Sequence, residues 1–160
     1  MPDVVSNTGP LIALASIGQF GLLQTLFQTV YIPLAVRAEI QDEKSARALA
    51  ESRWVVVRSV TDRLAAQMLQ GELDRGESEA IVLAREMNAD LVLIDERAAT
   101  RKSRSLGMNT IGTLGVLLMA KERGVLRAIK PALNDLRGSG FRMKDRLYHQ
   151  VLDSANESEP

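Results

Sequence analysis

Short apolar runs alternate with longer stretches of helical periodicity along the chain. The runs are rich in β-branched side chains, which favours strands, and between them apolar residues recur every three or four positions, which is typical of helices. We therefore predict strands at residues 4–5, 30–32, 54–57, 91–94 and 109–111. Helices are predicted at residues 10–27 in two pieces, 33–40, 61–70, 76–87, after residue 95, from residue 113, and twice within 125–153.

The run Leu91-Val92-Leu93-Ile94 is apolar at every position, which predicts a strand buried on both faces. Strands that alternate with helices are joined by right-handed crossovers and form a parallel sheet covered on each side. The pattern therefore predicts an α/β fold with helices on both faces of a mostly parallel sheet of about five strands.

Length and composition limit the choices further. The chain has 160 residues, 46% of them hydrophobic and 25% charged, which suits one globular domain of ordinary size. We expect a single domain over residues 1–153 and a flexible acidic tail over 154–160. No apolar run is long enough to span a membrane, no basic and apolar leader opens the chain, and cysteine is absent, so a cytoplasmic location is expected.

Charge is divided unevenly along the chain although the net charge is zero. Residues 1–96 hold 8 Lys or Arg against 14 Asp or Glu, whereas residues 97–150 hold 12 against 3. An acidic cluster beside a basic surface would suit a metal-dependent enzyme that acts on a polyanion. The same division would also arise from ordinary solvated helix faces.

Candidate chemistry lies where the predicted strands end. Asn7 and Thr8 follow the first strand, and Asp95 and Glu96 follow the fourth. Ligands of open parallel sheets bind at this edge. Glu39 and the stretch Gly76-Glu77-Ser78-Glu79 add further carboxylates. These side chains offer hard oxygen ligands, which suit Mg²⁺ or Mn²⁺ and argue against zinc.

Each of these residues also has an ordinary structural interpretation. Asp95 or the Asn7-Thr8 pair could cap the helix that follows, Glu77 could complement a helix dipole, and Glu39 could lie on a solvated face. The turn from Gly112 to Gly115 could hold a phosphate, but it has no lysine and no GxGxxG pattern, which favours tight packing there.

Six ordered motifs together resemble the PIN-domain nucleases, and especially their prokaryotic VapC-like ribonuclease branch. The motifs are residues 5–12 (VSNTGPLI), 36–40 (VRAEI), 75–80 (RGESEA), 93–97 (LIDER), 111–117 (IGTLGVL) and the turn from 120–121 to 124. The resemblance implies a three-layer α/β/α fold and an acidic site that binds a divalent metal for the hydrolysis of RNA.

The resemblance also assigns roles residue by residue. It implies that the catalytic and metal-binding positions are Asn7, Glu39, Glu77 and Asp95. Asn7 stands where active members commonly have Asp, so one negative charge is missing. Thr8 would be the neighbouring hydroxyl, and Glu79 and Glu96 are nearby acids that could assist. The resemblance does not fix the roles of the cations after the fourth strand; their charge predicts phosphate contacts, so Thr8, Arg97 and Arg101 are the expected RNA-binding residues.

Three functions remain open at this point. The first is a Mg²⁺- or Mn²⁺-dependent ribonuclease similar to toxin components of toxin–antitoxin pairs, with RNA, an antitoxin protein and a second copy of the chain as partners. The second is a catalytically impaired PIN-like protein that binds RNA or a partner, because Asn7 replaces the usual first Asp. The third is a small-molecule or nucleotide binder at the same sheet edge.

Overall fold

The computed structural model describes residues 2–158, and this part of the chain forms one five-stranded parallel sheet covered by ten helices. The strands are β1 (Val4–Ser6), β2 (Val30–Ile32), β3 (Val55–Val57), β4 (Leu91–Leu93) and β5 (Thr110–Ile111). Their order in the sheet is β3-β2-β1-β4-β5, and every neighbouring pair is parallel. The predicted three-layer α/β/α class is confirmed.

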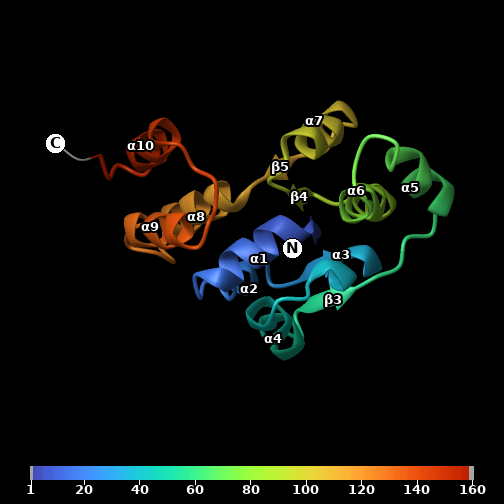
Figure 1. Cartoon of the computed structure of the whole chain (residues 1–160), viewed down its shortest axis with the longest axis horizontal. Coiled ribbons are helices and arrows are strands. Elements are labelled where there is room, and N and C mark those ends of the chain that lie inside the picture. The colour runs from blue at the N-terminus through green and yellow to red at the C-terminus, as the bar shows by residue number, and fades with distance from the viewer. Residues whose placement is uncertain (1, 159–160) are drawn as a thin grey trace.

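The helices divide between the two faces of the sheet (Figure 1). They are α1 (Thr8–Ser16), α2 (Leu22–Phe27), α3 (Leu34–Glu39), α4 (Glu43–Glu51), α5 (Arg63–Leu69), α6 (Arg75–Met87), α7 (Arg97–Ser105), α8 (Thr113–Glu122), α9 (Lys130–Gly138) and α10 (Asp145–Ser154). Helices α1, α2, α8, α9 and α10 share the larger core, whereas α6 and α7 pack against the opposite face. Figure 1 shows α8, α9 and α10 gathered at one end of the molecule.

Alternation along the central strands explains the two cores. Val4 and Leu93 face the larger core, while Val5 and Val92 face the smaller one, as the two-residue period of a strand requires. All four side chains are fully buried. The sheet is therefore apolar on both sides, and its polar residues are confined to the strand ends.

Helix α4 is an element that the sequence pattern did not predict, because its residues lie in a charged stretch of the chain. Its start is fixed locally: the Asp42 side chain accepts a hydrogen bond from the Ser45 backbone N–H at 2.9 Å. Such an N-cap stabilises a helix by about 1 kcal/mol. The five predicted strands and the other predicted helices are present.

Glu157 lies within the stretch where a flexible acidic tail is expected, and it contacts the helical part of the domain. Glu157 lies 2.9 Å from Lys121 Nζ and accepts hydrogen bonds from the backbone N–H groups of Ile129 and Lys130. It therefore satisfies donors at the start of α9. Residues 159 and 160 of the expected tail lie outside the described residues. No helix among the described residues is long and apolar enough to cross a membrane.

Candidate functional site

The strand order creates a crevice beside β1. The chain leaves β1 toward β2 on one side, and β4 pairs with β1 on the other. The strand order therefore reverses between β1 and β4. In open parallel sheets the connections that follow two such strands diverge at the carboxyl ends of the strands, and ligands bind in the gap between them. The Asn7 backbone N–H donates to the Leu93 carbonyl at 2.9 Å, so the ends of β1 and β4 lie side by side. Asn7 and Asp95 thus lie at one edge.

Asn7 occupies the N-cap position of α1, but its side chain makes no capping hydrogen bond. The residue is only 5% exposed, and within residues 2–158 no donor reaches its Oδ1 atom. An unpaired buried acceptor costs about 1–3 kcal/mol. The capping interpretation does not account for this side chain, whereas an external donor or a cation at the site would satisfy it.

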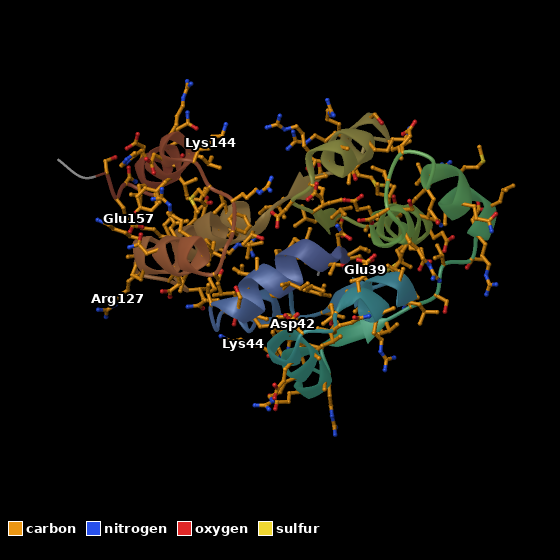
Figure 2. The ribbon with its side chains drawn as sticks, viewed as in Figure 1. Glu39, Asp42, Lys44, Arg127, Lys144 and Glu157 are labelled. Atoms are coloured by element: carbon orange, nitrogen blue, oxygen red, sulfur yellow. The ribbon has the colours of Figure 1, made fainter. Side chains whose placement is uncertain are left out.

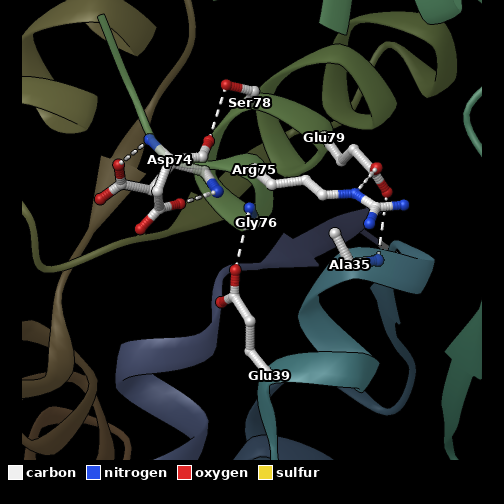
Figure 3. A network of polar contacts seen from close by, with 8 residues as sticks. Ala35, Glu39, Asp74, Arg75, Gly76, Ser78 and Glu79 are labelled. Carbon is white, nitrogen blue, oxygen red and sulfur yellow. Dashed lines mark hydrogen bonds and ion pairs between the residues drawn. The ribbon is translucent and has the colours of Figure 1, made fainter. Parts of the chain in front are cut away.

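Glu39 ends α3 and reaches across to two other elements. Its carboxylate accepts a hydrogen bond from Thr8 Oγ1 at 2.5 Å and one from the Gly76 backbone N–H at 3.0 Å. Figure 3 shows the side chain pointing from α3 toward the start of α6. A Cβ atom on Gly76 would lie 2.5 Å from both carboxylate oxygens, so only glycine admits this approach. Glu39 is exposed, but its carboxylate is held in place by these two bonds.

Asp95 is held by Thr113, the first residue of α8. The Thr113 backbone N–H and Oγ1 each donate to one Asp95 carboxylate oxygen, both at 2.7 Å. The interpretation of Asp95 as the cap of the following helix is wrong, because Glu96 occupies the N-cap position of α7. Gly112 packs against this carboxylate, and a Cβ there would lie 2.7 Å from Asp95 Oδ1. This close approach agrees with the packing role expected for the 112–115 turn.

Glu77 is buried in the first turn of α6. It forms a capping box with Asp74: the Glu77 backbone N–H donates to Asp74 Oδ1 at 2.8 Å, and the Asp74 N–H donates to Glu77 Oε1 at 3.1 Å. Burial raises the pKa of Glu77, the Asp74 N–H opposes this effect, and the charges of Asp74, Glu96 and Glu39 raise the pKa further. Burial is the main cause of the shift, and the contribution of the like charges indicates that these carboxylates lie near one another.

The assisting residues are not equally well placed. Glu79 turns away toward α3, where it accepts hydrogen bonds from the Ala35 N–H and from Arg75 (Figure 3). Glu96 and Arg97 line a cleft of about 810 Å³ beside Asp95. Arg101 is exposed on α7 outside the lining of that cleft.

The side-chain oxygens at this edge are of the chemical type that divalent cations such as Mg²⁺ bind. Among residues 2–158, no three Asp, Glu, His or Cys side chains lie close enough together to hold a metal ion. Mg²⁺ needs no such set, because it is usually bound through one or two carboxylates and keeps several waters. The unpaired Oδ1 of Asn7 and the solvent-accessible carboxylates of Glu39 and Asp95 offer ligands of this kind.

Sequence reasoning missed the residues that position these acids and that shape the cleft. Thr113 and Gly76 orient carboxylates contributed by distant segments, and Phe141 and Arg142 line the cleft from the turn between α9 and α10. A glycine in the first turn of a helix with acidic residues, as in Gly76-Glu77, was the available signal for a close backbone approach.

Comparison with known proteins agrees with this arrangement. Residues 3–157 match the model of a family described as PIN domain. The chain belongs to the PIN-domain family. Membership indicates a nuclease-type activity in general, with RNA as the type of substrate, and PIN domains are generally dependent on divalent metals. A search of curated proteins found no match.

Proposed function

We propose that this PIN-domain protein is a Mg²⁺- or Mn²⁺-dependent endoribonuclease similar to the VapC-like toxin components of toxin–antitoxin pairs. The observation that carries the proposal is the unpaired, buried Asn7 Oδ1 at the sheet edge where the Glu39, Glu77 and Asp95 carboxylates also lie. In this proposal these four residues form the metal site, and water molecules occupy the coordination positions that the four side chains leave open. An antitoxin protein and a second copy of the chain are the proposed partners, and the proposed location is the cytoplasm.

Each side chain has a distinct task in this mechanism. Thr113 fixes both oxygens of Asp95, and Thr8 and the Gly76 N–H fix Glu39, so the carboxylates are oriented before a ligand arrives. A divalent cation, when bound, activates water and neutralises charge that develops on the phosphate. Preorganised ligands of this kind require little rearrangement during the reaction. No side-chain nucleophile is needed.

One observation favours the second candidate function, a PIN-domain protein that binds RNA without cutting it. Asn7 supplies an oxygen but no negative charge, and the described residues contain no group of three acidic, histidine or cysteine side chains arranged for a metal. A cation would then be held weakly. RNA affinity would survive in such a protein, whereas metal-dependent cleavage would be absent.

Cleavage of a mixed RNA pool by the purified protein, compared in Mn²⁺, Mg²⁺ and EDTA, separates the two candidates. The nuclease proposal expects cutting in either metal and none in EDTA. Running Asn7→Asp beside the wild type adds a second comparison, because the substitution restores one carboxylate without enlarging the side chain. If only Asn7→Asp cuts RNA, the natural chain is the binding protein.

A further inference from the structure

Strand β3 ends the sheet on one side, and one edge of its backbone is open. The Trp54 carbonyl accepts a hydrogen bond from β2 at 3.1 Å, and the Arg58 N–H donates one to β2 at 2.9 Å. Backbone groups of successive strand residues point to opposite sides, so those of Val55 and Val57 point away from β2. Within residues 2–158 no strand lies on that side. The Val57 N–H and the carbonyls of Val55 and Val57 therefore have no strand partner.

The sequence of β3 does not protect this edge. Proteins usually protect an open strand edge with a charged residue or a proline inside the strand, because such an edge pairs readily with another chain. Strand β3 is Val55-Val56-Val57 and carries neither. Three successive β-branched residues favour an extended backbone. The edge is therefore formed in advance for one short additional strand.

A groove of about 420 Å³, here called the β3 groove, lies between β3 and the helices α3 and α4. Figure 1 shows both helices next to β3. The apolar part of the lining consists of Ile40, Ala46, Leu49, Val55 and Val57, with the methyl group of Ala50. No lining residue belongs to β2, so the groove lies at the outer margin of the sheet. Every second side chain of a strand added to β3 would point into it.

The charge around this edge is positive. Arg37 and Arg53 line the β3 groove, and the guanidinium group of Arg58 lies over the Tyr31 ring, 4.6 Å from its centroid. All three arginines are exposed, and none forms an ion pair within residues 2–158. Among the described residues, the groove lining contains no Asp or Glu. Because residues 1–96 as a whole hold 8 Lys or Arg against 14 Asp or Glu, this edge is a local basic surface that complements an acidic ligand.

Two other occupants fit these observations less well. Pairing of β3 with β3 of a second copy would bring Arg53 and Arg58 of both copies to one short interface, and like charges that face each other destabilise a strand pair. RNA would use the arginines but neither the open backbone groups nor the aliphatic lining. Among the described residues, that lining includes no aromatic ring on which a base could stack.

We propose that the outer edge of β3 binds an extended acidic segment of a partner protein, which adds a strand to the sheet. Main-chain hydrogen bonds to Val55 and Val57 supply affinity, as in other complexes formed by strand addition. Apolar side chains of the segment enter the β3 groove, and its carboxylates pair with Arg37, Arg53 and Arg58. None of the four residues of the proposed metal site lines this groove, so the inference goes beyond the proposed function and does not depend on it.

The test measures the binding of a defined peptide in EDTA and without RNA. The probe is a fluorescein-labelled ten-residue peptide in which Val and Glu alternate, followed by anisotropy. Trp54 is the one tryptophan of the chain and directly precedes β3, so a change in its emission on adding unlabelled peptide reports binding at this edge. The same peptide with Lys in place of Glu should bind at least about tenfold more weakly, because its charges repel the arginines.

Val57→Pro tests the backbone contact. Proline removes the outward N–H and is tolerated where an edge strand faces solvent, so the fold should persist. Loss of one hydrogen bond should weaken peptide binding by at least about fivefold. Val57→Ala keeps the N–H and should bind the peptide more tightly than Val57→Pro. A peptide methylated at every backbone nitrogen makes the same comparison on the wild-type protein and should also bind at least about fivefold more weakly.

Arginine substitutions supply the electrostatic comparison. Arg53→Gln should weaken binding of the acidic peptide by about twofold to fivefold, the range for one exposed ion pair. Arg127→Gln is the matched control, because it removes an equal charge from an exposed residue that Figure 2 places at the far end of the molecule from β3. It should bind the peptide like the wild type.

Equal affinity for the Glu and Lys peptides, or undiminished binding of the methylated peptide, would overturn the inference. So would wild-type affinity in Val57→Pro that circular dichroism shows to be folded; if this variant is unfolded, the methylated peptide decides. A single-stranded RNA that displaces the peptide and binds Val57→Pro as tightly as the wild type would show that the arginines recognise phosphate, which also contradicts a peptide site.

Discussion

Gly76→Ala should disable the proposed site without unfolding the protein. A Cβ atom at residue 76 would lie 2.5 Å from Glu39 Oε1, 2.5 Å from Oε2 and 2.8 Å from Cδ. Ordinary contacts begin near 3.4 Å, so the carboxylate must move by about 1 Å and give up its bond to the Gly76 N–H. Misplacement of a catalytic group by about 1 Å can lower the rate on the order of a hundredfold.

The same substitution should change stability little. Losing a hydrogen bond to a charged acceptor costs about 1.5–3 kcal/mol of stability. Because Glu39 is exposed, we expect a cost of about 1.5 kcal/mol, the low end of that range. Alanine in place of glycine in a helix returns up to about 1 kcal/mol. The net change is therefore about 1 kcal/mol or less, which shifts the melting temperature by about 2–4 °C in a domain of this size.

The assay pairs the rate of RNA cleavage in Mn²⁺ with the melting temperature. Gly138→Ala is the matched control, because Gly138 also lies in a helix and a Cβ there meets nothing within 4 Å. It should retain the wild-type rate. Full activity of Gly76→Ala would show that the position of Glu39 is irrelevant to cleavage, and an unfolded variant would show that the stability reasoning is wrong.

Two further predictions concern the buried carboxylate of Glu77 and the partly buried one of Glu157. Glu77→Gln keeps the oxygen that accepts the capping-box hydrogen bond, but it removes a buried charge that neighbouring carboxylates repel. The variant protein should therefore have a melting temperature about 2–4 °C higher than the wild type in EDTA at pH 7. A lower melting temperature would show that this repulsion does not destabilise the protein. Burial alone would raise the pKa of Glu157, but the hydrogen bonds that its carboxylate accepts outweigh this effect and lower the pKa. Glu157→Gln should therefore lower the free energy of unfolding by about 1.5 kcal/mol at neutral pH, measured by chemical denaturation. That deficit should vanish as the pH falls through the folded-state pKa, since the stabilisation exists only while the carboxylate is charged. A deficit independent of pH, or an equal one in exposed Glu122→Gln, would contradict this account.

The sequence allowed the sheet to be predicted because its signals are local. The apolar residues at 91–94 and the valines at 4–5 sit between turn formers and amphipathic helices, and each forms part of a central strand as expected. Helix α4 was missed because it lies in a charged stretch, although Ala46 and Leu49 do recur at helical spacing and pack against the larger core. Its apolar side is short and only partly buried, so its sequence signal is weak.

The acids of the site could be named from the sequence, but their partners could not. Glu39 meets Gly76 across 37 residues, and Asp95 meets Thr113 across 18 because β5 pairs with β4. Nothing near Glu157 in the sequence indicates Lys121 as its partner, and nothing near Phe141 indicates a cleft shared with α7. Strand order and long-range packing decide these contacts.

The most direct test of the central claim is a side-by-side measurement of RNA cleavage by the wild type and Asp95→Asn in Mn²⁺. The substitution keeps the size of the side chain and removes the charge held at the end of β4, so the fold should persist while the proposed metal site fails. The account predicts metal-dependent cutting by the wild type and its loss, by a hundredfold or more, in the variant. An unchanged cleavage rate in well-folded Asp95→Asn would contradict it.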